Sequence, residues 1–226
     1  MIPAPAPAAS AGAQPSTSSG VVILSAGPCA LLVELADLAA VRRYYADAQR
    51  RRRGGLLPTT VLDIVPAART LLFDGLDDPT ALARDLPHWH PVTPDASTAR
   101  HVEVPTIYDG ADLLEVARLW DMTREELIST HSSGTHEVAF LGFAPGFAYI
   151  SGLPPQHPVS RRAKPRTQVP AGSVALAGEF TGIYPRRSPG GWQLIGRTAE
   201  VMWDAAREPP VLLTPGRRIQ FVKVSG

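Results

Sequence analysis

A run of basic residues follows an aromatic, glycine-rich segment in the second half of the chain. From His131 to Ser160 the only formally charged residue is Glu137. Between residues 161 and 200 seven bases face two acids: Arg161, Arg162, Lys164, Arg166, Arg186, Arg187 and Arg197 against Glu179 and Glu200. A guanidinium binds carboxylate or phosphate through paired hydrogen bonds, so this pattern predicts a pocket for a small anionic ligand. A β-barrel whose turns require glycine and proline would explain the same glycine-rich and proline-rich composition.

Two arginines and one histidine are candidates for chemistry at this pocket. Arg162 and Arg166 lie on either side of Pro165, which restricts the backbone and gives nearby side chains a defined starting position. We expect Arg166 to be catalytic through charge neutralisation and Arg162 to bind substrate, although both could be ordinary surface arginines. His131 is the imidazole beside the aromatic segment, and it could be a catalytic acid or base or simply cap a helix.

The other candidates would form the walls of the pocket. Aromatic side chains between residues 143 and 149 could line it, or could belong to a barrel core. Glycines at 146, 190 and 191 would let a ligand approach the backbone closely. Ser173 could be a nucleophile, although no Ser-His-Asp arrangement follows from the spacing. The residues expected to bind substrate are Phe143, Pro145, Gly146, Phe147, Tyr149, Arg162, Ser173, Gly190, Gly191, Trp192 and Gln193.

Other motifs point away from metals, nucleic acids and membranes. His88 and His90 flank Trp89 without a third ligand nearby, so we expect no metal site. The sequence holds no Walker-type phosphate loop. The net charge of +1 does not indicate a nucleic-acid partner. The four arginines at 50–53 could bind nucleic acid or membrane, but cations before Gly54 are also ordinary capping at a helix C-terminus. No apolar run approaches the roughly 20 residues that span a bilayer.

Two features predict where the protein works. Residues 1–20 are rich in alanine, proline and serine and lack the charged and apolar regions of a secretory signal, so we expect a disordered leader. The single cysteine, Cys29, excludes an intrachain disulfide and fits a reducing compartment. The sequence therefore predicts a cytoplasmic protein.

The elements that must position these residues indicate an α+β fold with two domains. Residues 21–105 follow the order strand, helix, strand, strand, helix, strand, which is that of a ferredoxin-like split βαβ domain. Its helices should be capped by Asp37 and Asp78. In residues 106–226, two short helices capped at Asp112 and Thr123 precede many short strands, including one at 201–203. That pattern predicts a closed or nearly closed β-barrel.

Four motifs carry a resemblance to a known family. They are residues 142–149 (GFAPGFAY), 161–166 (RRAKPR), 169–174 (VPAGSV) and 189–198 (PGGWQLIGRT), in this order and at close spacing. Over nearly everything after the leader, the chain resembles the allophanate hydrolase subunit 1 family, which is also called the Kip inhibitor family or the family of 5-oxoprolinase B-type subunits. The resemblance implies a ferredoxin-like N-terminal domain followed by a cyclophilin-like barrel of the carboxyltransferase type.

The resemblance also implies a shared task. Members pair with a companion barrel protein, which is either an allophanate hydrolase subunit 2 or a 5-oxoprolinase C-type subunit. With a third subunit, the pair hydrolyses 5-oxoproline to glutamate at the expense of ATP. The chain would then be part of an ATP-dependent hydrolase acting on a small anionic cyclic amide, active only in the complex, where ATP could also be bound. Allophanate hydrolase, a urea carboxylase-type carboxyltransferase and a Kip-type inhibitor of a histidine kinase remain alternatives.

The chain departs from this family at three places. His136 stands where a tyrosine is common, Phe180 stands where a glutamine is common, and a longer glycine-containing segment is shortened to Gly110–Leu113. The absence of an amide at Phe180 removes a potential donor or acceptor from the pocket. Oxoproline-like and urea-like substrates both stay open on the sequence.

Overall fold

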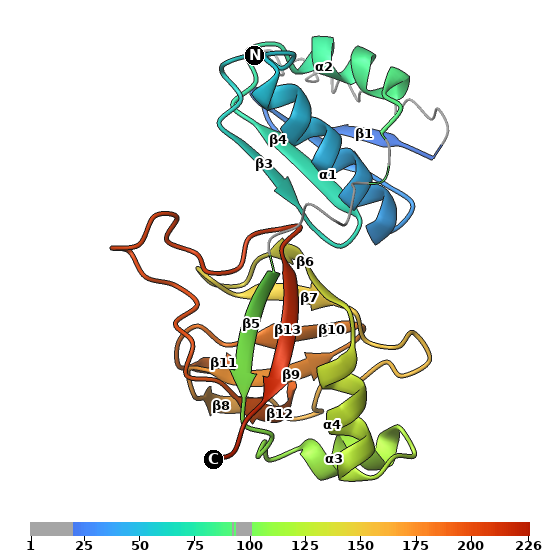
Figure 1. The fold of residues 1–226 in the computed structure, drawn as a ribbon. Coiled ribbons are helices and arrows are strands. Elements are labelled where there is room, and N and C mark those ends of the chain that lie inside the picture. Colours follow the sequence, from blue (N-terminus) through green and yellow to red (C-terminus); the bar gives the residue numbers. More distant parts are fainter. Residues whose placement is uncertain (1–19, 92, 94–100) are drawn as a thin grey trace, which may run out of the picture. The chain divides into compact units, whose positions relative to one another are not determined.

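The computed structural model describes residues 20–91, 93 and 101–226 (Figure 1). They form two compact units that divide between residues 92 and 93, except that residues 66–68 group with the second unit. The predicted leader lies outside the described residues, apart from Gly20. Among the described residues, no helix is long and apolar enough to cross a membrane.

The first unit is built on a four-stranded sheet with the order β1-β2-β4-β3. Its strands and helices are β1 (Val22–Ser25), β2 (Ala30–Glu34), α1 (Leu38–Arg53), β3 (Asp63–Pro66), β4 (Thr70–Asp74), α2 (Pro79–Asp85) and the 3-10 turn η1 (Leu86–His88). The predicted caps are confirmed, since Asp37 accepts from the Ala40 amide at 2.7 Å and Asp78 from the Ala81 amide at 3.1 Å. Residues of α1 contact β4 and residues of α2 contact β2.

The predicted last strand of this unit belongs elsewhere. Residues 101–104 do form a strand, β5 (His101–Thr106), but it pairs in parallel with β13 (Arg218–Lys223) in the second unit. The edge beside β2 is filled by β1, because the segment before α1 makes a hairpin and not a single strand. The predicted strand order for residues 21–105 is therefore wrong at its two ends, and the ferredoxin-like arrangement is not confirmed.

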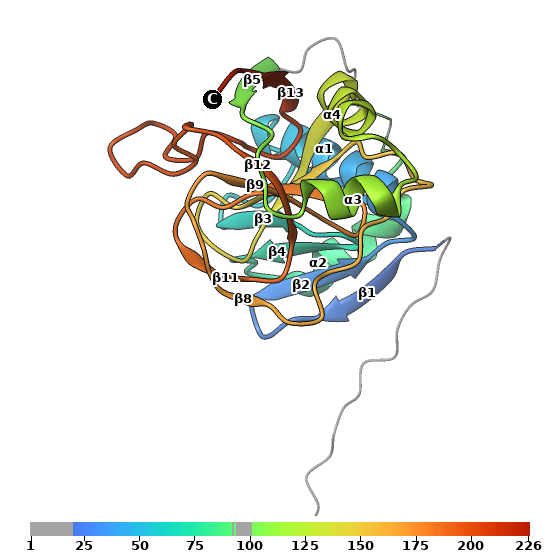
Figure 2. The same ribbon diagram turned by 90° about the horizontal axis from the view of Figure 1, so that it is seen from below.

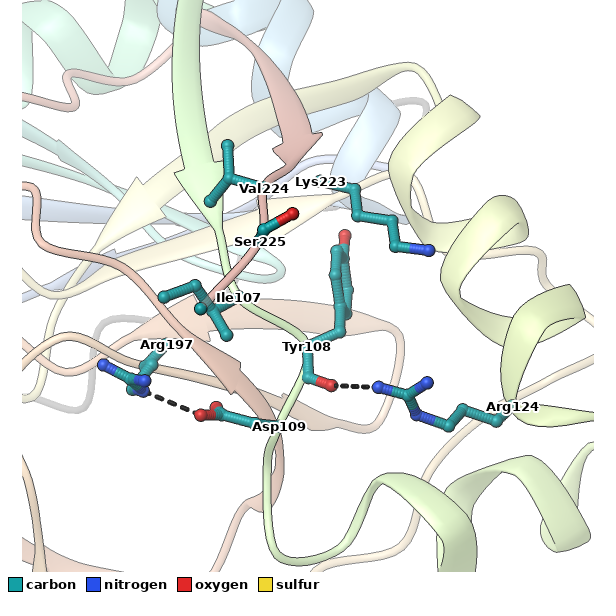
Figure 3. A pocket seen from close by; sticks show the side chains of 9 residues that line it. Ile107, Tyr108, Asp109, Arg124, Arg197, Lys223, Val224 and Ser225 are labelled. Atoms are coloured by element: carbon teal, nitrogen blue, oxygen red, sulfur yellow. Dashed lines mark hydrogen bonds and ion pairs between the residues drawn. The ribbon is translucent and has the colours of Figure 1, made fainter.

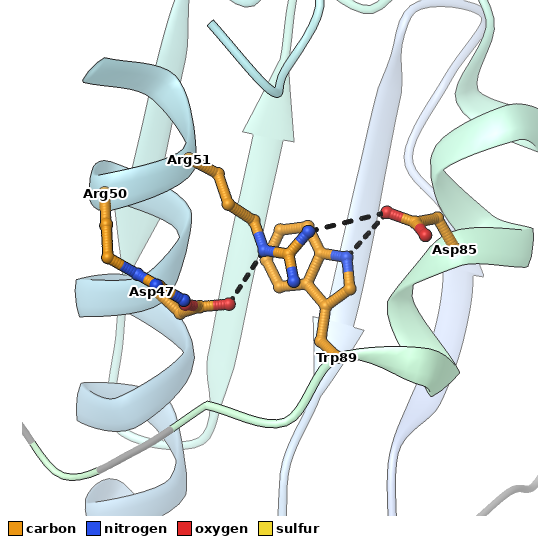
Figure 4. Close-up of polar contacts among 5 residues, drawn as sticks. All are labelled: Asp47, Arg50, Arg51, Asp85 and Trp89. Carbon is orange, nitrogen blue, oxygen red and sulfur yellow. Dashed lines mark hydrogen bonds and ion pairs between the residues drawn. The ribbon is translucent and has the colours of Figure 1, made fainter. Parts of the chain in front are cut away.

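Two of the four arginines at the end of α1, Arg50 and Arg51, form contacts within the first unit. Asp47 is 4% exposed and accepts hydrogen bonds from Arg50 and from Arg51, the latter at 2.8 Å. Burial would raise the pKa of Asp47, but these hydrogen bonds outweigh it and lower the pKa. Figure 4 shows the Arg51 guanidinium stacked over Trp89, 4.2 Å from the ring centroid, while Asp85 accepts from the indole N–H. These contacts favour the structural interpretation of the arginines.

The second unit is a seven-stranded sheet with the order β12-β9-β10-β7-β6-β13-β5 (Figure 1). Its remaining strands are β6 (His136–Leu141), β7 (Ala148–Ser151), β9 (Ser173–Ala177), β10 (Phe180–Ile183) and β12 (Gln193–Arg197). Directly after β5, Ile107 makes an antiparallel bridge to Arg197 at the end of β12. Because this bridge joins the two edges of the sheet, the predicted nearly closed barrel is confirmed.

Both faces of β9 are covered, since all five of its residues are buried. Val174 and Leu176 point into the main barrel core, whereas Ala175 and Ala177 belong to a second apolar cluster on the opposite face. That second cluster includes Val169 from β8 (Arg166–Val169), which pairs with β11 (Ser188–Gly190) in a small ribbon. The β8–β11 ribbon therefore brings the arginine-rich segment close to the aromatic residues of the barrel.

Two helices, α3 (Leu113–Leu119) and α4 (Arg124–Ser133), lie between β5 and β6 in the chain. Both views place α3 beside β12, and residues of the two elements are in contact (Figures 1 and 2). The capping box of Thr123 and Glu126 is confirmed. Asp112 does occupy the N-cap position of α3, but its side chain makes no capping hydrogen bond. The predicted strand at 201–203 is replaced by an isolated bridge between Trp203 and Val211.

Candidate functional site

Asp112 holds two of the predicted site residues together. Its carboxyl Oδ1 accepts from Arg162 Nη1 and from Arg166 Nη2, each at 2.7 Å. Its Oδ2 accepts from the Leu194 amide at 2.7 Å, and the aspartate is 2% exposed. We call Asp112, Arg162 and Arg166 the arginine cluster.

Backbone contacts fix each member of the arginine cluster. The Asp112 amide donates to the Leu194 carbonyl at 2.9 Å, so the segment before α3 runs along β12. Gly110 makes this close approach possible, because a Cβ there would stand 2.3 Å from the Ile195 carbonyl carbon. The Arg162 amide donates to the Gly191 carbonyl at 2.8 Å, and Arg166 faces Gly190 across the β8–β11 ribbon.

The arginine cluster keeps unused hydrogen-bond donors. Arg162 Nε and Arg166 Nη1 are buried and have no partner among the described residues. Their side chains are nevertheless 32% and 23% exposed, so neither arginine is fully enclosed. One carboxylate faces two guanidinium groups, which leaves a net charge of +1. Buried donors without partners cost free energy, and an anion bound here would satisfy them.

Several predicted wall residues surround the arginine cluster. Gln193 Nε2 donates to the Ser160 carbonyl at 3.2 Å, while its Oε1 is buried without a partner among the described residues. The Arg161 guanidinium lies over the Trp192 ring, 5.9 Å from the centroid. A Cβ at Gly190 would stand 2.2 Å from the Tyr184 hydroxyl, so glycine is required there. Burial raises the pKa of Tyr184, and its hydroxyl therefore stays protonated.

The three aromatic residues expected to line the pocket differ in exposure: Phe147 is buried, Tyr149 is half-buried and Phe143 is exposed. Phe147 is 1% exposed and makes edge contacts with Tyr149, Tyr184 and Trp192. Phe143 differs, because it is 63% exposed and has a positive φ of 67°, a backbone conformation that costs energy for residues other than glycine. Its ring still contacts Phe147, with centroids 5.2 Å apart. Phe143 is therefore the most accessible of the three aromatic residues to a ligand or partner.

His131 lies away from the arginine cluster, in the barrel core. It has 0% exposure, with Nδ1 2.7 Å from the Tyr108 hydroxyl and Nε2 3.1 Å from Thr181 Oγ1. Burial, and then the neighbouring His136, lower the pKa of His131 well below its usual value, so the ring is neutral. Thr181 and Gly182 are consecutive in β10, and Gly182 faces Phe147 and Trp192. His131 thus contacts the opposite face of that strand, which favours a structural role.

The last three predicted residues are near the aromatic cluster without joining the arginines. Ser173 is 5% exposed and faces Arg197 across the β9–β12 pair. Pro145 is exposed, and Gly146 has a φ of 81° with its Cα packed close to Trp203. Sequence reasoning missed Asp112 and Tyr184 as site residues. Asp112 has the pattern of a helix cap, and no local signal distinguishes it from one.

Comparisons with known proteins identify the family of this chain. The family model for the carboxyltransferase domain, subdomains C and D, matches residues 21–213. The chain belongs to this family. The B-type subunit of 5-oxoprolinase from Escherichia coli O157:H7 is 38% identical over 207 residues, which cover 87% of this chain and 93% of that protein.

Solved structures share the carboxyltransferase-domain fold. The crystal structure of TTHA0988 is similar with a TM-score of 0.72 and 35% sequence identity over 87% of this chain. The present chain covers 40% of that longer chain. The urea amidolyase of K. lactis has a TM-score of 0.67 and 21% identity, covering 91% of this chain and 15% of that one, and so shows the fold alone.

Proposed function

We propose that this chain is the B-type subunit of an ATP-dependent 5-oxoprolinase, which hydrolyses 5-oxoproline to glutamate in the cytoplasm. It would act with a companion barrel protein, the C-type subunit of 5-oxoprolinase, and with a third subunit. The similarity to a 5-oxoprolinase B-type subunit over 93% of that protein supports the family-level part of the proposal. The arginine cluster carries the residue-level part.

The arginine cluster suits the chemistry of 5-oxoproline. This substrate has a carboxylate beside its lactam ring, and the unused donors of Arg162 and Arg166 could form hydrogen bonds to a carboxylate or a phosphoryl group. Asp112 fixes both guanidinium groups in place while neutralising only one charge. A positioned, net cationic site is what ring opening through a phosphorylated amide requires, since such reactions depend on positioning and charge neutralisation.

ATP would supply the phosphoryl group that activates the ring amide oxygen before water attacks. Because the sequence has no Walker loop, we place ATP binding in the complex. The role of this chain is then to bind and orient the anionic substrate. Among the described residues, no group of three or more metal-binding side chains occurs.

Reconstitution tests the proposed function. The chain and a companion C-type protein should co-purify, and the complete complex should release glutamate from 5-oxoproline only when ATP is present. The chain alone and the companion alone serve as controls and should be inactive. A complete complex that releases no glutamate, but acts on allophanate or carboxylates urea, would refute the substrate. The inhibitor function would be favoured if the chain inhibits a histidine kinase and a double variant of Arg162 and Arg166 inhibits it equally strongly.

A further inference from the structure

A second cationic site lies where the barrel closes. Three lining residues carry positive charge, namely Arg124 from α4, Arg197 from β12 and Lys223 from β13, around a cavity of about 360 Å³. The other lining residues are Ile107, Tyr108, Asp109, Val224, Ser225 and Gly226. We call this cavity the seam pocket, because Ile107 and Arg197 form the bridge that closes the sheet.

The seam pocket is separate from the arginine cluster. Residues 107–112 run along β12, with Ile107 opposite Arg197 at one end and Asp112 bonded to Leu194 at the other. The β12 residues that Ile107 and Asp112 face, Arg197 and Leu194, are three positions apart, which is roughly 10 Å along a strand. Neither Arg162 nor Arg166 lines the seam pocket.

The three cations keep donors for a ligand. Arg197 uses Nε to bind Asp109 at 2.8 Å, and its two terminal amino groups have no partner among the described residues. Arg124 donates to the Tyr108 carbonyl at 3.0 Å and more weakly to Glu125 at 3.3 Å. Within the described part of the chain, the side chain of Lys223 makes no hydrogen bond or ion pair, although its backbone pairs with β5. Figure 3 shows Arg197 and Arg124 on opposite sides of Tyr108, with Lys223 on the same side as Arg124.

Charge and shape together indicate the class of ligand. The lining side chains carry three positive charges and one negative charge, from Asp109, and Glu125 pairs with Arg124 at 3.3 Å, which leaves a net charge of +1 over these five groups. An anionic phosphate group complements this charge, and arginine forks match its oxygen geometry. Ile107 and Val224 add apolar surface beside the cations. We propose that the seam pocket binds a phosphate group, either as inorganic phosphate or as a small phosphate ester.

Titration of the isolated, full-length chain tests this site without any partner subunit. Inorganic phosphate and phenyl phosphate are the two probes, followed by calorimetry and by amide NMR shifts at residues 107–109 and 197. Tighter binding of phenyl phosphate would assign the apolar surface to an ester, and equal binding would assign the site to phosphate itself. Lys223→Gln should raise the dissociation constant about fivefold, and the Arg197→Gln, Lys223→Gln double variant at least tenfold.

Three variants make the outcome decisive. Arg118→Gln removes an exposed arginine on α3 and should leave phosphate binding unchanged. Arg166→Lys changes the arginine cluster, which could itself take up phosphate, and should leave the phosphate-induced NMR shifts at residues 107–109 and 197 unchanged. Thermal melts check folding, and Lys223→Gln stays informative if the loss of the Arg197–Asp109 ion pair destabilises the double variant. The proposal would be overturned if the chain bound no phosphate, or if Arg118→Gln weakened binding as much as Lys223→Gln does. It would also be overturned if binding were lost in Arg166→Lys but kept in Lys223→Gln.

Discussion

Replacing Arg166 by lysine separates charge from geometry in the arginine cluster. In the natural chain, Arg166 Nη2 donates a hydrogen bond to Asp112, and Arg166 Nη1 has no partner among the described residues. A lysine has one ammonium group, so it can keep the ion pair with Asp112 or contact the substrate, but cannot do both through a planar fork. Losing one charge-assisted hydrogen bond to the substrate costs about 1.5 to 3 kcal/mol, which corresponds to roughly a 10-fold to 150-fold fall in kcat/KM.

The effect on stability should be much smaller than the effect on activity. Lysine can retain the contact with Asp112, and the 23% exposure of the Arg166 side chain allows solvent to screen the change, so we expect at most about 1 kcal/mol. The assay is ATP-dependent glutamate release by the reconstituted complex, alongside a thermal melt of the variant chain. Arg187→Lys is the matched control, since Arg187 is exposed on the loop before β11. Unchanged kinetics, or a melting temperature that falls in proportion to activity, would refute the assigned role.

Three further predictions concern the parts that hold the barrel unit together. Asp112→Asn leaves two guanidinium groups facing a neutral amide, so stability should fall by about 2 kcal/mol and the melting temperature by about 4–8 °C, whereas exposed Glu115→Gln should change neither. Gly110→Ala places a Cβ 2.3 Å from backbone atoms of β12, so chemical denaturation should show a free energy of unfolding lower by about 1–3 kcal/mol. Gly142→Ala is the control and should be tolerated, because a Cβ there would stand 3.5 Å from the Tyr149 ring. Burial lowers the folded-state pKa of His131 and His136, so the unfolded chain takes up protons first as the pH falls. The stabilisation from keeping these two histidines neutral is complete above about pH 6.5 and is lost as the pH falls below it, by at most about 1.4 kcal/mol per pH unit for each proton. In melts from pH 7.5 to 5.5, the melting temperature should fall less steeply with pH in His136→Gln than in the natural chain. The exposed His88→Gln variant should not change this slope.

The sequence was informative wherever local chemistry decides local structure. Helix caps at Asp37 and Asp78 and the Thr123–Glu126 capping box depend on residues three apart, and all three are confirmed. The barrel was also predictable, because short strands between glycines and prolines have few other arrangements. The partner of β5 was not, since its pairing with β13 joins residues more than 100 positions apart and no local pattern encodes that choice.

The candidate site shows the same division between local and distant information. Arg162 and Arg166 could be chosen from charge and a neighbouring proline, which are local. Asp112 could not, because its role depends on a segment 50 residues further along the chain, and its position before α3 already offered a sufficient local explanation. His131 was chosen because it is close in sequence to the aromatic segment, but its Nε2 contacts Thr181 on the face of β10 away from Phe147 and Trp192, and its catalytic role stays a prediction.

The closure of the barrel gives one physical reason why two cationic sites occur in one small unit. Residues 107–112 can lie against β12 only because glycines stand at 110 and 196, where a Cβ would come within 2.5 Å of the opposing backbone. That close approach places Asp112 beside Leu194, where the carboxylate binds Arg166 of β8 and Arg162 of the loop before it. The other end of the segment places Asp109 beside Arg197 and lines the seam pocket. A shift of this segment would therefore disturb both sites together, whereas changes in the cationic side chains would affect each site alone.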